Sequence, residues 1–197
     1  MKNLVSVIVN CYNGEKFLHE ALESVISQTY TNWELIFYDN SSVDSSKEIF
    51  LRYENKKFRY FKSNKNLKLY EARNNAISCA KGDFYAFLDS DDIWFPNKLK
   101  LQLDTFIDEK VGFSCGNFIY INQRNNLNKS KKVFDSLPSG NVLDDFLADY
   151  FVHMSSLIIR KKAFDSIGKG FNPNYSIVGD FELSLRISLD WMLSSIQ

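Results

Sequence analysis

The sequence predicts an α/β fold in which a mostly parallel sheet is flanked by helices. Short apolar runs alternate with segments of helical periodicity through the first 110 residues. Three of these runs stop abruptly in polar residues, at positions 10, 39 and 89. Strand–helix–strand repeats build parallel sheets with helices on both faces. Because ligands bind beyond the carboxyl ends of the strands in such sheets, the three polar run-ends mark candidate binding residues.

The first half of the chain alternates strands and helices in order. Strands are expected at residues 4–9, 33–38, 58–61 and 84–88, each a short apolar or β-branched run. A helix is expected at residues 15–28, where apolar side chains have helical spacing. Two more are expected at residues 45–53, which the polar residues before it can cap, and at residues 70–80, which Lys81-Gly82 ends. A further helix is expected from Pro96, because proline suits the first turn of a helix.

The pattern changes after residue 110. Residues 111–121 are expected to form one long strand, and the almost wholly polar residues 122–132 a mobile loop. Helices are expected at residues 142–150 and 182–193, with a strand at residues 156–160. No stretch has the composition of an interdomain linker, so residues 1–197 are expected to form a single domain.

Composition narrows the class of protein. The 197 residues contain 45% hydrophobic side chains, and 24 basic residues balance 24 acidic ones. This balance gives no electrostatic basis for binding nucleic acid. The odd set of Cys11, Cys79 and Cys115 predicts free thiols in a reducing compartment. Without a signal peptide or an apolar run of about 20 residues, a cytoplasmic protein is expected, with peripheral membrane contact left open.

The third polar run-end is an acidic cluster, Asp89-Ser90-Asp91-Asp92. Carboxylates this close repel one another and resist joint ionisation, and a cation would relieve that repulsion. Mg²⁺ and Mn²⁺ take oxygen ligands and often bridge carboxylates to substrate phosphates. The cluster therefore indicates a metal-assisted phosphate or diphosphate site. The alternative is a solvated acidic turn that caps the next helix.

The other two run-ends offer contacts for a nucleoside. Tyr12 has a flat ring that can stack on a base, or it is simply a half-buried loop aromatic. Asp39 can accept hydrogen bonds from a base or a ribose hydroxyl. Its alternative role is helix capping, which suits Asp44 better.

Two further observations shape the chemistry. Neither a G-x-G-x-x-G loop after the first strand nor a G-x-x-x-x-G-K-[ST] loop occurs, which excludes the dinucleotide-dehydrogenase and P-loop classes. A bound diphosphate would therefore need a metal to balance its charge. Asp180, which precedes an apolar-periodic segment, is either a helix cap or a general base that deprotonates a hydroxyl.

Seven segments together resemble glycosyltransferase family 2, which has the GT-A fold. They are residues 5–14, 27–36, 39–44, 72–77, 80–83, 88–92 and 155–160, followed by Gly179-Asp180. They cover nearly the whole chain in the family's order. The resemblance implies a Rossmann-like sheet, with residues 1–110 as the nucleotide-binding half and residues 111–197 as the acceptor-side half.

The resemblance also assigns the donor-binding residues. It implies that a nucleotide sugar, with UDP favoured, is bound by Tyr12 beside the base and by Asp39 at the nucleoside. Asn40 stands where the family often has a second aspartate, and its amide can still form a hydrogen bond there. Asp89 would lie near the ribose.

For catalysis, the resemblance implies a hexosyltransferase-type reaction with inversion. Asp91 would bind the Mn²⁺ or Mg²⁺ that bridges the donor diphosphate, and Asp92 would share that role. Asp180 would be the base that activates a hydroxyl of a glycan or lipid-linked glycan acceptor. The expected process is synthesis of cell-surface polysaccharide or lipopolysaccharide at the inner face of the membrane, and the oligomeric state is left open.

Several departures from the family pattern accompany the match. Asn10-Cys11 replaces the frequent Pro-Thr, and Gly179 replaces the common glutamate before Asp180. Family members usually continue further beyond this aspartate, so the chain is expected to be either a C-terminally truncated or a minimal version of the domain. Two alternatives remain: a catalytically incomplete nucleotide-sugar-binding protein of the same fold, and a Mg²⁺-dependent hydrolase that uses strand-end aspartates.

Overall fold

The computed structural model of the protein describes residues 3–53, 55–122 and 129–197. The strands are β1 (Val5–Cys11), β2 (Trp33–Asp39), β3 (Phe58–Lys62), β4 (Phe84–Asp89), β5 (Val111–Gly116), β6 (Ile119–Asn122), β7 (Lys129–Lys132), β8 (Ile158–Arg160) and β9 (Met192–Ile196). The helices are α1 (Leu18–Ile26), α2 (Ser46–Leu51), α3 (Leu69–Ser78), α4 (Lys98–Leu103), α5 (Leu143–Ala148), α6 (Lys161–Ser166) and α7 (Gly179–Ser188), with a 3₁₀ turn at Met154–Ser156.

Within these described ranges, seven strands form one mixed sheet in the order β3-β2-β1-β4-β8-β5-β9. Strands β1 to β4 are parallel, and so are β5 and β9, whereas β8 is antiparallel to both of its neighbours. The sheet is therefore mostly parallel, which confirms the predicted fold class. Because β8 joins β4 to β5, the sheet runs on from the first half of the chain into the second.

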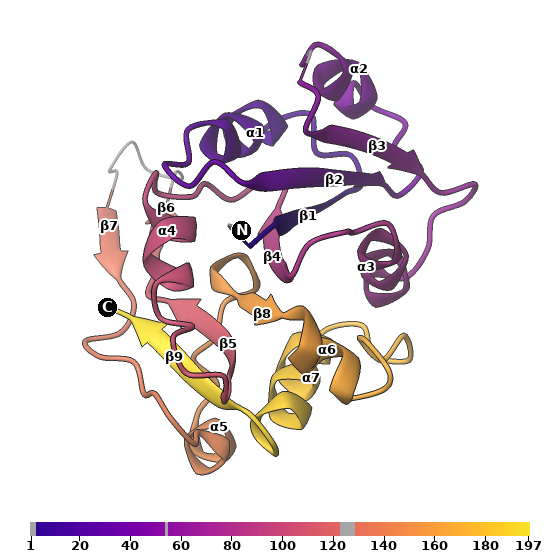
Figure 1. Ribbon diagram of the computed structural model, residues 1–197. Helices are drawn as coiled ribbons and strands as arrows, with labels where there is room; N and C mark the ends of the chain where they lie inside the picture. The colour runs from indigo at the N-terminus through magenta and orange to yellow at the C-terminus, as the bar shows by residue number, and fades with distance from the viewer. Residues whose placement is uncertain (1–2, 54, 123–128) are drawn as a thin grey trace.

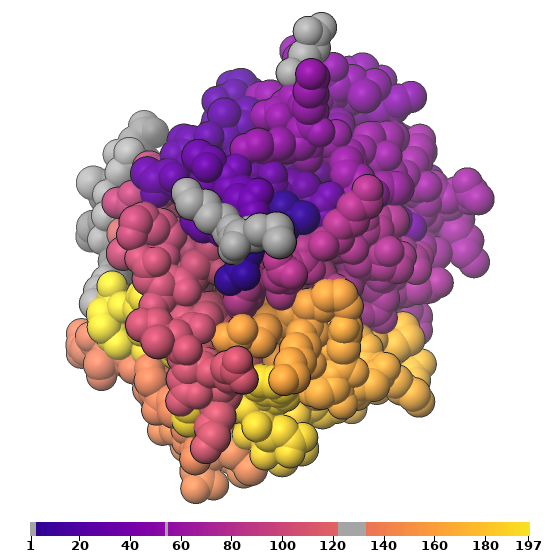
Figure 2. All heavy atoms as spheres, in the orientation of Figure 1, coloured from indigo at the N-terminus to yellow at the C-terminus, as the bar shows by residue number. Residues whose placement is uncertain are grey.

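Helices cover both faces of the sheet (Figure 1). Side chains of α1, α2 and α4 pack into the core on one face, and those of α3, α5, α6 and α7 into the core on the other. The apolar residues whose spacing predicts α1 are the ones that the helix buries: Leu18, Ala21, Leu22 and Val25. In Figure 2 the early residues occupy one side of the molecule and the late residues the other, in direct contact.

The single long strand expected at residues 111–121 is wrong, because the structure divides it into β5 and β6. The break lies at Asn117, whose Oδ1 accepts hydrogen bonds from the amides of Phe118 and Phe134, while its Nδ2 donates to the Phe134 carbonyl. The chain leaves the main sheet here and enters the β6–β7 hairpin. The apolar sequence of residues 111–121 does not show that the chain leaves the main sheet at this point.

Residues 122–132 were expected to form a polar mobile loop. Asn122 ends β6, and Lys129–Lys132 forms β7, which pairs antiparallel with β6, so the loop prediction is wrong for these positions. Backbone pairing makes a strand here without an apolar pattern. Residues 123–128 lie outside the described residues.

The helix expected at residues 182–193 is wrong in its second part. Helix α7 ends at Ser188, and Met192–Ile196 forms β9 beside β5. The amides of Asp190 and Trp191 both donate to the Ile187 carbonyl, which ends the helix in a tight turn. Apolar residues such as those at 192 and 193 fit helix and strand equally, and pairing with β5 decides between them.

In the parts of the chain that the structure describes, no helix combines the length and the apolar character needed to cross a membrane.

Candidate functional site

The carboxyl ends of β1, β2 and β4 lie side by side. Strand β1 is the middle strand of the three, with Cys11 in register with Asp39 and Asn10 in register with Asp89. The three polar run-ends of the sequence therefore meet at one edge of the sheet. Side chains that leave these ends can act on the same ligand.

Hydrogen bonds to short polar side chains join the loops after β1 and β2. The amides of Asn13 and Glu15 donate to Ser42 Oγ and Asp44 Oδ2, and the amide of Val43 donates to Asn13 Oδ1. Burial acts to raise the pKa of Asp44, but hydrogen bonds from Ser46 and Glu15 outweigh it and lower that pKa. Asp44 thus organises the two loops, while Ser45 is the N-cap residue of α2.

The first loop also packs against the acidic turn. A Cβ on Gly14 would lie 2.8 Å from Cys11 Sγ and 2.9 Å from Ser90 Oγ, so only glycine lets the two segments approach this closely. Beside this contact, the Tyr12 ring is 50% exposed. Asn10 Nδ2 is buried without a hydrogen-bond partner among the described residues. This loop therefore offers one open ring and one unpaired amide.

Asp39 is fully buried at the end of β2, and both of its carboxylate oxygens are engaged. Oδ1 accepts a 2.7 Å hydrogen bond from the amide of Ser42, and Oδ2 a 2.6 Å bond from the hydroxyl of Tyr60. These contacts make Asp39 the support of the loop that follows β2. Its predicted contact with a nucleoside stays a prediction.

Asn40 is also buried and fastens the segment that leads into α3. Its Nδ2 donates to Asn66 Oδ1 and to the Leu67 carbonyl, and its Oδ1 accepts from the Leu67 amide and from Ser63 Oγ. An aspartate could not donate the first two of these bonds. The departure from the family pattern at this position therefore has a structural reason.

The acidic turn after β4 contains three carboxylates that differ in their bonding partners. Asp89 Oδ1 lies 2.6 Å from Nη2 of Arg73, whose side chain is 5% exposed on α3. Asp92 Oδ2 accepts a 2.5 Å bond from Ser155 Oγ and lies 3.7 Å from His153 Nδ1. Asp91 is exposed and accepts no hydrogen bond from any described residue.

Burial raises the pKa of Asp92, the charges of Asp89 and Asp91 add to that rise, and the hydrogen bond from Ser155 opposes it. The repulsion expected of carboxylates packed into one turn is thus present, but burial is the larger cause of the raised pKa. Ser155 also accepts the amide of Asp89 through Oγ and the indole N–H of Trp94 through its carbonyl. Ser155 therefore fixes the turn at both ends.

Asp180 lies in the first turn of α7, where its partly buried carboxylate faces α3. Its Oδ1 lies 3.4 Å from the Tyr70 hydroxyl. The Tyr70 ring is 5.7 Å from the guanidinium of Arg73, which pairs with Asp89. Tyr70 and Arg73 of α3 thus connect Asp180 to the acidic turn at Asp89.

The carboxylates of the acidic turn bear on whether a divalent ion can bind there. Within residues 3–53, 55–122 and 129–197, no group of three His, Cys, Asp or Glu side chains could enclose one. Mg²⁺ bound with a nucleotide does not need such a cage, because one or two carboxylates and the substrate phosphates suffice. Asp91 is open, and Asp92 Oδ1 accepts no hydrogen bond from the described residues, so this donor set fits.

Sequence reasoning missed four residues of this site. Arg73 and Ser155 lie in segments that match the family pattern and carry no predicted role, although a charged residue among apolar helix positions is a usable signal. His153 and Tyr70 had no assigned role, because their partners are distant in the sequence. Asp92 lies 61 residues before His153 in the sequence, and Tyr70 110 before Asp180.

Residues 6–168 match the family model described as Glycosyl transferase family 2. The chain is 36% identical over 126 residues to the UDP-Glc:alpha-D-GlcNAc-diphosphoundecaprenol beta-1,3-glucosyltransferase WfgD of Escherichia coli, covering 64% of this chain and 50% of that protein. It is 31% identical over 194 residues to the uncharacterized glycosyltransferase RT0329 of Rickettsia typhi, covering 94% of this chain and 59% of that protein.

Solved structures agree with the fold. The S. aureus TarS 1-349 complex with UDP superposes with a TM-score of 0.74 at 22% identity, over 100% of this chain and 61% of that one. The mannosyltransferase PcManGT from Pyrobaculum calidifontis, in complex with GDP-Man and Mn²⁺, gives 0.77 at 18% identity, over 100% and 57%. These neighbours confirm the predicted GT-A fold. The chain spans about half the length of the first curated relatives it matches.

Proposed function

The chain belongs to glycosyl transferase family 2, and on that premise we propose that it moves a sugar from a nucleotide-diphosphate sugar to an acceptor hydroxyl. A UDP-sugar is the favoured donor, and the reaction inverts the anomeric carbon. The acceptor is a glycan or lipid-linked glycan in cell-surface polysaccharide synthesis. The names of WfgD and of the putative teichuronic acid biosynthesis glycosyltransferase TuaG of Bacillus subtilis support this choice.

The meeting of the three strand ends at one edge carries the proposal. It supplies an open aromatic ring at Tyr12 and an open carboxylate at Asp91 on neighbouring strand ends. A nucleoside diphosphate has a flat base at one end and a charged diphosphate at the other. These two residues suit those two ends.

In this proposal Tyr12 stacks on the base, since its side chain is half-exposed. Asp39 and Asn40 shape the nucleoside side through the loops they hold, and each is proposed to lie beside the nucleoside. Asp89, held by Arg73, accepts hydrogen bonds from the ribose. Asn10 Nδ2, which is buried and unpaired, is an available donor at the same edge.

Asp91, with Asp92 Oδ1 as a second ligand, would hold Mn²⁺ or Mg²⁺ against the donor diphosphate. A divalent ion there supplies positive charge that stabilises the departing nucleoside diphosphate. The PcManGT complex with Mn²⁺ supports this cofactor. Ser155 and His153 orient Asp92 through its other oxygen.

Asp180 is the proposed general base. Its carboxylate accepts the proton of the acceptor hydroxyl as that oxygen attacks the anomeric carbon from the face opposite the leaving diphosphate. A lipid-linked acceptor would bring the reaction to a membrane face, in keeping with the expected cytoplasmic location and peripheral membrane contact.

The test is a panel of UDP-, GDP- and TDP-sugars, measured by thermal shift and by donor hydrolysis with and without Mn²⁺. We expect a UDP-sugar to give the largest Mn²⁺-dependent shift and slow release of UDP. Binding without turnover under every condition would support the catalytically incomplete alternative. Cleavage of simple phosphoesters without regard to the nucleotide would support the hydrolase alternative.

A further inference from the structure

Tyr70 is a buried tyrosine whose hydroxyl reaches the start of α7. Its side chain belongs to α3 and is 1% exposed. The hydroxyl donates a 2.8 Å hydrogen bond to the carbonyl of Ile177 and lies 3.4 Å from Asp180 Oδ1. One side chain thus touches both the entry to α7 and the carboxylate in its first turn.

The Tyr70 ring also occupies the place of a side chain at position 179. A Cβ on Gly179 would lie 2.5 Å from Tyr70 Cε2 and 2.6 Å from its Cζ. Any residue other than glycine would therefore force the ring or the helix to move. The glycine that replaces the family's common glutamate here is explained by the ring that fills its space.

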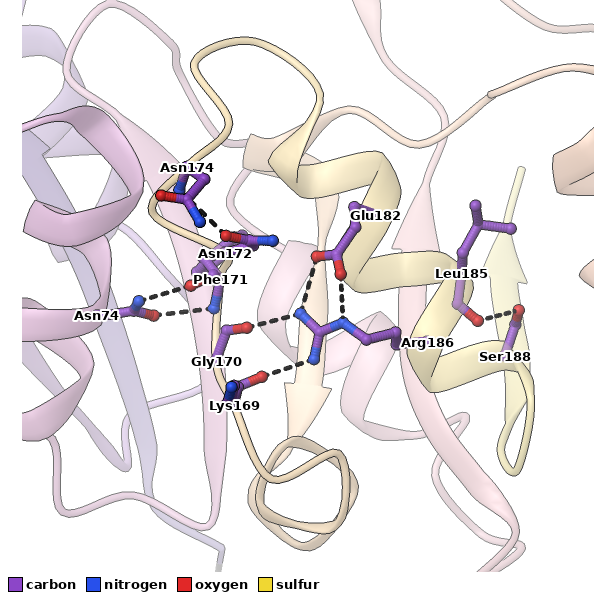
Figure 3. Close-up of polar contacts among 10 residues, drawn as sticks. All are labelled: Asn74, Lys169, Gly170, Phe171, Asn172, Asn174, Glu182, Leu185, Arg186 and Ser188. Carbon is purple, nitrogen blue, oxygen red and sulfur yellow. Dashed lines mark hydrogen bonds and ion pairs between the residues drawn. The ribbon is translucent and has the colours of Figure 1, made fainter.

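The ring has a rigid support beneath it. Phe171 stacks on Tyr70 with centroids 5.4 Å apart and planes 15° apart. Asn74 of α3 holds Phe171 by both backbone groups, since its Nδ2 donates to the carbonyl at 2.7 Å and its Oδ1 accepts from the amide at 2.9 Å (Figure 3). The support therefore moves with α3.

The same segment is fastened to α7. Arg186 donates to the carbonyls of Lys169 and Gly170, each at 2.6 Å, and forms an ion pair with Glu182 (Figure 3). Helices α3 and α7 are thus joined through the segment of residues 169–171. Tyr70 lies at the end of this joint that is next to Asp180.

On its other side, Tyr70 contacts the residue that holds the acidic turn. The Arg73 guanidinium lies 5.7 Å from the Tyr70 ring centroid and 2.6 Å from Asp89 Oδ1. The path from Asp180 to the acidic turn is therefore short and made of buried, packed side chains. Such packing allows little independent movement of its two ends.

We propose that Tyr70 is a positioning residue for Asp180: its hydroxyl fixes the start of α7, and its ring, seated over Gly179, sets the carboxylate relative to the acidic turn. This inference rests on the proposed function, because it takes Asp180 as the base. Burial and the charge of Asp180 raise the pKa of the Tyr70 hydroxyl, which therefore remains a donor through the neutral range.

The test compares Tyr70→Phe with Tyr85→Phe in donor turnover, UDP affinity and thermal stability. Tyr70→Phe keeps the stacked ring and removes only the hydroxyl. Tyr85 is also buried, but it lies on β4, and its hydroxyl is beside Lys161 and Asp165 rather than Asp180. We expect Tyr70→Phe to lower kcat by about tenfold or more, the size of effect that a slightly misplaced catalytic group produces, with UDP affinity unchanged. Tyr85→Phe should retain wild-type kcat.

Wild-type kcat in Tyr70→Phe would overturn the inference, and so would a parallel fall in kcat, UDP affinity and thermal stability. Gly179→Ala, which displaces the ring but keeps the hydroxyl, should lower kcat in the same way.

Hydrogen exchange at the amides of residues 178–181 gives a readout independent of turnover, and Tyr70→Phe should speed it. An inactive wild type with this faster exchange would defeat the proposed function and leave the anchoring of α7 established. Unchanged exchange would defeat the inference itself.

Discussion

Arg73 Nη2 lies 2.6 Å from Asp89 Oδ1, and the two side chains differ sharply in exposure, at 5% and 35%. The guanidinium is held among the rings of Tyr70 and Phe171, whereas the carboxylate stands at the rim of the sheet. A buried cation therefore holds a surface carboxylate in one orientation. Preorganisation of this kind lowers the cost of binding a ligand at that carboxylate.

Replacing Arg73 by methionine keeps the buried stem and removes the pair. We expect the free energy of unfolding to fall by about 1–3 kcal/mol, the cost of leaving a partly buried polar group without its partner. UDP affinity should fall as well, because Asp89 loses its fixed orientation. Urea unfolding and calorimetric titration with UDP measure the two effects. Arg52→Met, at an exposed position, should change neither, and equal effects in both variants would contradict the prediction.

Asp91→Asn tests the open carboxylate. The amide is nearly isosteric but neutral, and an amide is a much weaker ligand for a hard divalent ion than a carboxylate. We expect the Mn²⁺-dependent part of the thermal shift with UDP to disappear, while stability without ligand stays within about 0.5 kcal/mol, as for other surface substitutions. Asp190→Asn, another exposed aspartate, is the control. A retained Mn²⁺-dependent shift would remove Asp91 from the metal site.

Asp180→Asn separates binding from chemistry. An asparagine preserves the shape of the first turn of α7 but cannot take a proton from a hydroxyl. We expect UDP binding and its Mn²⁺ dependence to persist, while transfer falls by about 10²-fold or more, the contribution typical of a general base. Thermal shift and product formation report the two properties on one sample. Equal loss of both would show that Asp180 has a structural role.

Because Lys98 is a buried lysine, we expect the stability of the fold to depend on pH. Its Nζ is buried without a hydrogen-bond partner among the described residues and lies 4.2 Å from the Trp94 ring centroid. Burial lowers the pKa of Lys98 to about 7, opposed only by the charge of Cys115. In the unfolded chain a lysine has a pKa of about 10.4, so between these two values only the unfolded state holds the proton. The free energy of unfolding should therefore rise with pH through this window.

Lys98→Met removes the amine and keeps the apolar stem. We expect it to be more stable than the wild type at pH 7, with a difference that shrinks as pH rises, since each unit of pKa depression corresponds to about 1.4 kcal/mol. Urea unfolding between about pH 7 and pH 9 measures the difference over part of this window. Lys100→Met, on the exposed side of α4, should run parallel to the wild type. A constant gap between Lys98→Met and the wild type would show that the amine does not titrate there.

Local patterns were sufficient for the elements of the first half. Strands β1, β2 and β4 are apolar runs, and α1 buries the stripe that its sequence displays, so their limits differ from expectation by only a few residues. In the second half, the strand break at Asn117 and the strand at residues 192–196 are set by partners far along the chain, namely Phe134 and β5. Such partners leave no local periodicity.

The sequence by itself determined the order of strands and helices and the presence of carboxylates at the strand ends, because periodicity and abrupt polar ends are properties of neighbouring residues. Only the tertiary structure decided which carboxylates are available. Asp39 and Asp92 accept hydrogen bonds from tyrosine and serine hydroxyls, Asp89 pairs with Arg73, and Asp91 remains open. Those partners come from positions 16 to 63 residues away, and folding is what brings them within hydrogen-bonding distance.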